Sequence, residues 1–178
     1  MIQLSGKFLR FRIRLHGLVQ KFTNFSEPRR PKRMTRQGRP VDQNFRQHDL
    51  LYHRCVKDDV LDGRMIASRI RIENPSVNWS KYSKPWDVVF DYPGCGIVRF
   101  VVRDLPYELP EGNDIPKGTK TRWFQPSHEP EELNYSHSEI ATFSDGERML
   151  KPSHGKIVKK QFQMKLHSHS LVILDPKK

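Results

Sequence analysis

The sequence predicts an α+β fold: a small single domain with a mostly antiparallel sheet and one or two helices, preceded by a basic N-terminal arm. A chain of 178 residues has the length of one domain with an appendage. Hydrophobic residues make up 35% of it, enough for a modest core. Short strand-like segments follow one another without the regular helical crossovers of parallel sheets, which favours antiparallel pairing.

Positive charge is concentrated at the start of the chain. Residues 1–48 contain 12 Lys and Arg against 2 acidic residues, a net charge of +10, whereas residues 49–178 contain 20 against 18, a net charge of +2. We therefore divide the chain into a basic arm and linker, 1–48, and an α+β globular domain, 49–178. Proline and glycine interrupt the basic run between Arg29 and Arg39, so we expect that run to stay solvated.

The first 33 residues admit several interpretations. Leu4, Phe8, Phe11 and Leu15 recur at spacings of 3 and 4, which predicts an amphipathic helix with an apolar stripe, but the same stretch also alternates as a strand does. Its basic composition, without an acid before Glu27, also suits a targeting segment. Alternatively, translation starts at Met34, and the shorter chain then has a net charge of +4.

The length of the apolar runs and the spacing of the cysteines indicate the cellular compartment. Arg10, Arg12 and Arg14 interrupt the apolar residues of the arm, so we expect no integral membrane segment. The two cysteines, Cys55 and Cys95, form no C-x-x-C motif, and they indicate neither a disulfide framework nor a thiolate zinc site. We expect a cytoplasmic protein, with organelle targeting by the N-terminal segment as the alternative.

Five segments of the domain have the pattern of strands. They are residues 50–52, 64–72, 86–90, 97–102 and 119–124. Asp62-Gly63 predicts a turn before the second segment, and the glycines and proline within 91–96 predict a turn before the fourth. Residues 106–118 contain three prolines and two glycines and are expected to form a surface loop.

The C-terminal part predicts a helix followed by a strand. Val158, Phe162 and Leu166 share one helical face, although Phe162, Met164 and Leu166 also alternate as in a strand. The lysines that fall outside the helical face are Lys159, Lys160 and Lys165. Residues 171–174 have the composition of a buried strand.

Histidines and acidic residues are densest between Ser127 and Glu139. His128 and His137 lie in this stretch, and imidazole and carboxyl groups are those that transfer protons near neutral pH. The same residues also fit a solvated loop with a capping box over 136–139 at the start of a helix. His167 and His169 would share one side of a strand, as two metal ligands can, but no metal-binding motif accompanies them, and we assign no metal site.

His53 and Glu139 are the candidate catalytic residues. Leu51-Tyr52-His53-Arg54 and residues 136–140 together resemble the layout of the ADP-ribosyltransferase superfamily. The resemblance implies that His53 or Arg54 contacts the dinucleotide NAD and that Glu139 is the catalytic carboxylate. Apart from NAD under this resemblance, we expect no cofactor, since the chain has no P-loop, dinucleotide-binding or hydrolase nucleophile motif.

The charge asymmetry favours a non-enzymatic binding or accessory module whose basic arm docks on nucleic acid or on another acidic partner surface. Such contacts are independent of sequence and strongly dependent on salt. The residues expected to make them are Arg10, Arg12, Arg14, Arg29, Arg30, Lys32, Arg33, Arg36 and Arg39. Two alternatives stay open: a small transferase with His53 and Glu139 in its site, and a subunit that packs on a protein partner through the apolar stripe of the arm.

Overall fold

The computed structural model describes residues 30–105, 107–108, 122–144 and 146–177. In chain order its elements are η1 (Lys32–Met34), β1 (Leu50–Cys55), η2 (Lys57–Asp59), β2 (Val60–Leu61), β3 (Arg64–Met65), η3 (Ala67–Arg69), β4 (Ser76–Trp79), α2 (Pro85–Val88), β5 (Gly96–Val101), η4 (Val102–Asp104), β6 (Tyr107–Glu108), β7 (Arg122–His128), β8 (His137–Ser144), β9 (Glu147–Arg148), α3 (Lys156–His169) and β10 (Leu171–Leu174). The predicted α+β class is confirmed.

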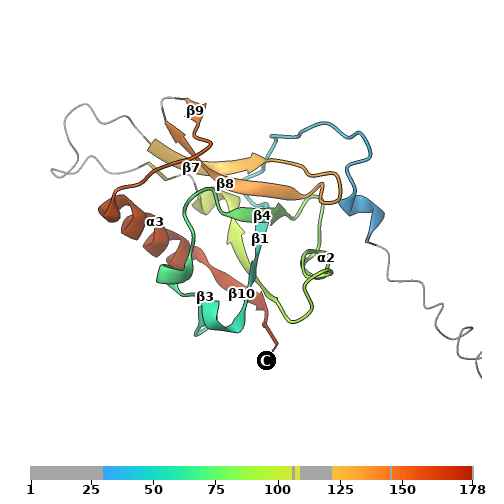
Figure 1. The fold of residues 1–178 in the computed structure, drawn as a ribbon, viewed down its shortest axis with the longest axis horizontal. Helices are drawn as coiled ribbons and strands as arrows, with labels where there is room; N and C mark the ends of the chain where they lie inside the picture. Colours follow the sequence, from blue (N-terminus) through green and yellow to red (C-terminus); the bar gives the residue numbers. More distant parts are fainter. Residues whose placement is uncertain (1–29, 106, 109–121, 145, 178) are drawn as a thin grey trace, which may run out of the picture.

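One antiparallel sheet organises the domain. Its strand order is β10-β5-β1-β4-β8-β7-β6, with β9 paired to β8, while β2 and β3 form a separate hairpin. Figure 1 shows α3 beneath one end of the sheet and α2 at the other end. None of the helices in the described part of the chain combines the length and the apolar character that a membrane span requires.

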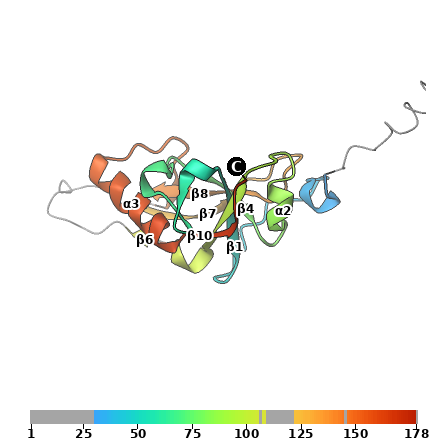
Figure 2. The same ribbon diagram turned by 90° about the horizontal axis from the view of Figure 1, so that it is seen from below.

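The core lies between the sheet and α3. Phe162 of α3 stacks on Phe124 of β7 with ring centroids 3.6 Å apart, and both side chains are buried. Trp79 fills the centre of the core and donates a hydrogen bond from Nε1 to Asp49 Oδ2 at 2.8 Å, so its one polar group is satisfied. Figure 2 shows α3 lying along the sheet from a second direction.

Strand β8 has two different faces. Ser138, Ile140 and Thr142 are fully buried on the core side, whereas His137 and Glu139 are partly exposed on the other side. The capping box predicted over 136–139 is therefore wrong. Seven residues of β8 pair with β7, and an extended backbone cannot begin a helix at that point.

Residues 30–48 lie against the domain. Met34 is 1% exposed, the Tyr135 backbone N–H donates to its carbonyl oxygen at 2.6 Å, and Arg33 donates two hydrogen bonds to the Asp87 carboxylate at 2.8 and 2.6 Å. The expectation that this basic run stays solvated is wrong for the described residues. An apolar anchor and a buried carboxylate hold it in place.

Two of the predicted strands are wrong. Residues 64–72 form only the short β3 and then η3, although the Asp62-Gly63 turn is confirmed, with φ of 50° and 73°. In a continuous strand Met65 would face away from Ile70 and Ile72, whereas the turn of η3 between them allows all three side chains to be buried in the core. In the predicted strand 86–90, residues 86–88 instead belong to the helix α2. Pro85 is its first residue, and the Asp87 carboxylate accepts the Lys84 backbone N–H at 2.7 Å.

The remaining predictions have mixed outcomes. The strands at 50–52 and 97–102 are confirmed as β1 and β5, and the helix is confirmed as α3. Residues 122–124 of the predicted strand 119–124 begin β7, and 119–121 lie outside the described residues, as does most of the loop 106–118. β10 is a strand but an exposed one, because it is the end strand of the sheet. β4 and β8 were not predicted.

Gly96 is required where β5 meets the C-terminal segment. A Cβ there would lie 2.5 Å from both the Leu174 carbonyl oxygen and the Pro176 nitrogen, and both are backbone atoms. We expect Gly96→Ala to lower the free energy of unfolding by about 1–3 kcal/mol, because the backbone must shift. Gly155→Ala is the control, since nothing lies within 4 Å of that position. Urea unfolding measures both, and equal losses would contradict the close approach.

Candidate functional site

The four sequence-predicted arginines that lie within the described residues, Arg30, Arg33, Arg36 and Arg39, all have partners. Arg10, Arg12, Arg14 and Arg29 lie outside the described residues. Of the others, Arg30 pairs with Asp91 and donates to the Leu133 carbonyl oxygen, and Arg33 binds Asp87 as described above. Arg36 and Arg39 donate to backbone carbonyls, and the Arg39 guanidinium lies 3.6 Å above the Tyr135 ring centroid. Lys32 is exposed.

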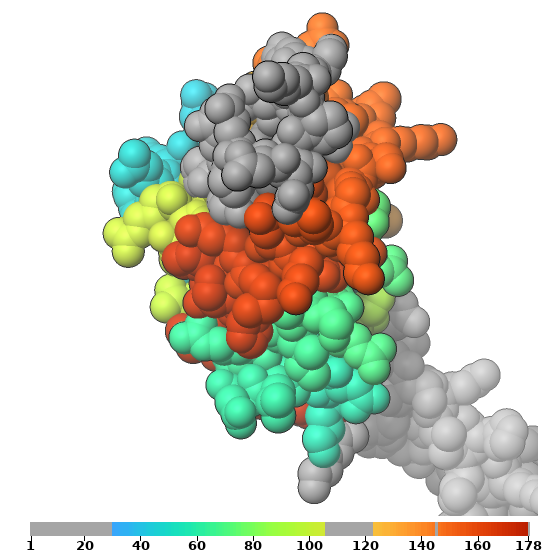
Figure 3. All heavy atoms as spheres, turned by 90° about the vertical axis from the view of Figure 1, so that its left-hand side faces the viewer, coloured from blue at the N-terminus to red at the C-terminus, as the bar shows by residue number. Residues whose placement is uncertain are grey.

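A second set of cations gathers where α3 meets residues 64–73. Three contacts align the two segments: Arg64 Nη1 donates to the Ser168 carbonyl oxygen at 2.6 Å, Gln163 Nε2 donates to the Ile70 carbonyl oxygen at 2.9 Å, and Lys159 Nζ lies 3.9 Å from Glu73 Oε1. The segment therefore runs antiparallel to the helix along its length. Figure 3 shows the two side by side on one face of the molecule.

Helix geometry places lysines beside the arginines of that segment. Lys156, Lys160, Gln163 and His167 follow one another at spacings of 4, 3 and 4, so they share one row of the helix. The last two of these residues bond to the 64–73 segment. We call the resulting surface the α3 basic face. Its members, all exposed, are Arg64, Arg69, Arg71, Lys156, Lys159 and Lys160.

The α3 basic face has little opposing charge. Residues 64–72 and 151–170 contain no Asp or Glu. Within the described part of the chain, Glu73 is the acidic group paired with this face, through Lys159, and that carboxylate is itself half exposed. Clustered cations without local counterions produce a positive potential that attracts anions.

A pocket of about 490 Å³ lies at the other end of the sheet, between η1, α2 and the ends of β1, β4 and β8. This volume is typical of small-molecule sites. The polar residues of its wall include His53, Arg54, Ser76, Asn78, Asn134 and His137. Met34, Val88 and Leu133 supply apolar wall.

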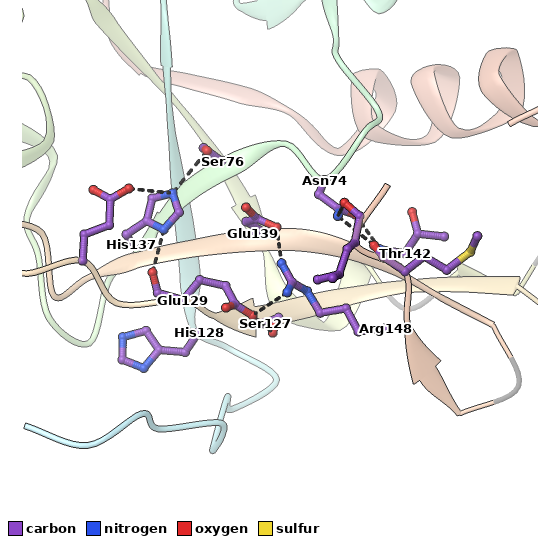
Figure 4. A network of polar contacts seen from close by, with 12 residues as sticks. Asn74, Ser76, Ser127, His128, Glu129, His137, Glu139, Thr142 and Arg148 are labelled. Atoms are coloured by element: carbon purple, nitrogen blue, oxygen red, sulfur yellow. Dashed lines mark hydrogen bonds and ion pairs between the residues drawn. The ribbon is translucent and has the colours of Figure 1, made fainter. Parts of the chain in front are cut away.

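His137 is oriented by its neighbours in this pocket. Its Nδ1 lies 2.7 Å from the Glu129 carbonyl oxygen, so Nδ1 carries a proton and donates it. In the neutral ring Nε2 is then the acceptor, and Ser76 Oγ lies 3.2 Å from it. The Glu131 carboxylate lies 3.9 Å from the same Nε2. Figure 4 shows these contacts radiating from the imidazole.

The structure places His53 in the pocket but not Glu139. His53 Nδ1 bonds the Ser76 carbonyl oxygen at 2.8 Å, and burial lowers the pKa of this histidine. Glu139 instead accepts a hydrogen bond from Arg148, which also pairs with Glu129, and it is not among the described residues of the pocket wall (Figure 4). The transferase alternative stays a prediction, without a shared pocket for its two residues.

His128, also in the predicted stretch, is fully buried beneath the site. Its Nδ1 accepts the Asp42 backbone N–H at 3.0 Å and its Nε2 donates to the Tyr135 carbonyl oxygen at 2.5 Å. The bond at Nδ1 requires the neutral ring, because only an unprotonated ring nitrogen accepts a hydrogen bond, and burial lowers the pKa of His128. Tyr82 stacks on it and donates to the Asp42 carboxylate. Hydrogen bonding from Lys81 and Tyr82 lowers the pKa of Asp42.

The remaining candidates have structural partners. His167 and His169 lie in the last turn of α3 and not on a strand, because the helix extends to His169; the first bonds the Met65 carbonyl oxygen and the second faces Asp104 at 3.6 Å. Within the described part of the chain, no three His, Cys, Asp or Glu side chains are grouped so that they could hold a metal ion. Burial raises the pKa of the Cys55 thiol to about 11, which disfavours the thiolate.

Sequence reasoning missed Ser76 and the six residues of the α3 basic face as a group. The absence of Asp and Glu from residues 64–72 and 151–170 could have indicated a basic surface, because the domain as a whole has nearly equal numbers of acidic and basic residues. No such signal marks Ser76, since its partner His137 is 61 residues away in the sequence.

Comparisons with known proteins add no functional information. No family model, curated protein or solved structure matches the chain. The surfaces and pockets of the described residues are therefore the basis for assigning a function.

The buried His128 makes stability dependent on pH. Its pKa is lower in the folded than in the unfolded state, so the unfolded state binds more protons and stability falls as pH drops below about 6.5. We expect the free energy of unfolding to decrease between pH 7.5 and 5.5, as measured by urea unfolding. His53, with a pKa shifted in the same direction, adds to the decrease.

His128→Gln should shrink this decrease, because Gln does not titrate. The exposed His48 provides the control: His48→Gln should keep the full decrease of the wild-type protein. An unchanged decrease in the His128 variant would show that folding does not lower the pKa of this histidine, contrary to its burial and to the hydrogen bond accepted at Nδ1.

Proposed function

We propose that the protein is a nucleic-acid-binding module that holds the phosphate backbone on the α3 basic face, without sequence preference. One observation carries the proposal: six exposed cations come from two segments that lie side by side, α3 and residues 64–71, and Lys159 is the one that pairs with an acid, Glu73, among the described residues. Regularly spaced phosphates complement such a surface better than a single anion does.

Packing supports a rigid binding surface. α3 is fixed by the Phe124–Phe162 stack, and the 64–73 segment is fixed to α3 by Gln163 and Arg64. The backbone that carries the cations is therefore held in position before a ligand arrives, which lowers the entropic cost of binding. The side chains of Lys156 and Lys160 are exposed, so their ammonium groups can reach the phosphates of a bound nucleic acid.

The basic arm is a second part of the proposal. Its net charge of +10 over residues 1–48 is partly neutralised where Arg30 and Arg33 bind aspartates. Arg10, Arg12 and Arg14 would add charge contacts to the same polyanion. Because residues 30–39 contact the domain, the principal contact with nucleic acid is on the α3 basic face.

The test is fluorescence anisotropy of the full chain with a labelled duplex DNA and a labelled single-stranded RNA, at 50–200 mM salt. We expect the double variant Lys156→Gln/Lys160→Gln to weaken duplex binding about tenfold at low salt. The slope of log K against log salt should become shallower by about 2, since each lost phosphate contact removes about 0.9.

A matched double variant, Arg46→Gln/Lys84→Gln, removes the same charge from exposed positions elsewhere, Lys84 being next to α2. It should bind almost as the wild-type protein does. A triple variant measures the contribution of the arm to nucleic-acid binding separately: Arg10→Gln/Arg12→Gln/Arg14→Gln. Equal weakening by both double variants, or binding of polyglutamate but not of nucleic acid, would overturn the proposed face or its ligand.

A further inference from the structure

The pocket at the α2 end contains a serine and a histidine arranged for nucleophilic chemistry. Ser76 and His137 lie on the neighbouring strands β4 and β8. Because Asn78 pairs with His137 and Ser76 with Glu139, Ser76 is the diagonal neighbour of the histidine on the same face of the sheet. This register brings Ser76 Oγ to 3.2 Å from His137 Nε2.

The histidine has the tautomer that a general base needs. The Glu129 carbonyl oxygen accepts the Nδ1 proton at 2.7 Å, which leaves the lone pair of Nε2 toward the hydroxyl. A nucleophile, a base and a group that orients the base are the three parts of an activated serine. After proton transfer, the Glu131 carboxylate at 3.9 Å from Nε2 is near enough to stabilise the imidazolium.

The surroundings suit an acyl substrate. Ser76 is exposed to the pocket, and its backbone is held by the hydrogen bond between its carbonyl oxygen and His53. Asn78 and Asn134 both line the pocket, and the Oδ1 atom of each lies 2.9 Å from Ser136 Oγ. The Ser136 hydroxyl donates its single proton to one of these oxygens, and the carboxamide nitrogen of that asparagine remains a donor. Such donors stabilise the negative charge that develops on a carbonyl oxygen.

We propose that Ser76 and His137 form a nucleophile–base pair that hydrolyses small carboxylic esters in this pocket. Ser76 Oγ bonds to the ester carbonyl carbon while its proton passes to His137 Nε2. The bond from that carbon to the alkoxy oxygen breaks, and the leaving oxygen takes the proton from Nε2. Water then attacks the acyl group, its proton returns through Nε2 to Ser76 Oγ, and the carboxylic acid leaves.

This activity is independent of the α3 basic face. The pocket and α3 lie at opposite ends of the sheet, and no residue of α3 lines the pocket. Substitutions on the lysines of α3 should therefore leave ester hydrolysis unchanged. Loss of the pocket chemistry likewise leaves the nucleic-acid proposal intact.

The first test is labelling of the full chain with diisopropyl fluorophosphate, followed by intact mass and peptide mapping. We expect one adduct on Ser76, none in Ser76→Ala, and a labelling rate at least 100-fold lower in His137→Gln, the scale of general-base assistance. Ser168→Ala, which removes an exposed hydroxyl on α3, should label as the wild-type protein does. Hydrolysis of p-nitrophenyl acetate should follow the same order.

A second measurement covers the case in which His137→Gln does not fold. In Ser76→Cys with His137 intact, the imidazole should favour the thiolate, and iodoacetamide should alkylate this cysteine at least tenfold faster than the cysteine of Ser168→Cys. An adduct elsewhere than Ser76, labelling that does not depend on His137, or equal alkylation of the two cysteines would each overturn the proposal.

Discussion

The buried, uncharged His128 holds together three segments on which the rest of the molecule depends. It accepts a hydrogen bond from the Asp42 backbone and donates one to the Tyr135 carbonyl oxygen, so it joins the N-terminal segment, the end of β7 and the loop before β8. That loop supplies Glu131, Leu133 and Asn134 to the pocket wall, and its Glu129 carbonyl oxygen accepts the hydrogen bond of His137 Nδ1. A charged imidazole would lose the acceptor at Nδ1, and burial opposes the charge.

The same constraint explains why the N-terminal segment is part of the fold. Tyr82 and Lys81 bind the Asp42 carboxylate, and the Tyr135 hydroxyl donates to the Pro40 carbonyl oxygen at 2.7 Å. These contacts place Met34 over the core and bring Arg33 to Asp87. Arg30, which the sequence assigns to a free arm, thereby lies in the pocket wall together with Met34.

The fold and the site differed in how far sequence could predict them. β1, β5 and α3 have local patterns strong enough to predict, because each buries one face of a regular element. β8 was missed because its residues are short and polar even on the buried face, where Ser138 and Thr142 are fully covered. His53 was placed in a site, and the structure puts it in the pocket, whereas its predicted partner Glu139 is bonded to Arg148.

Composition and local pattern alone determined the α+β class, the antiparallel sheet, the Asp62-Gly63 turn and the charge asymmetry, since each depends on neighbouring residues or on simple counts. Only the tertiary structure decided which cations stay available and which histidine meets a serine. Ser76 and His137 become neighbours through the register of β4 and β8, and Gln163 bonds α3 to Ile70 of the arginine-containing segment through helix packing. Contacts between residues far apart in sequence are set by register and packing, and no local pattern encodes them.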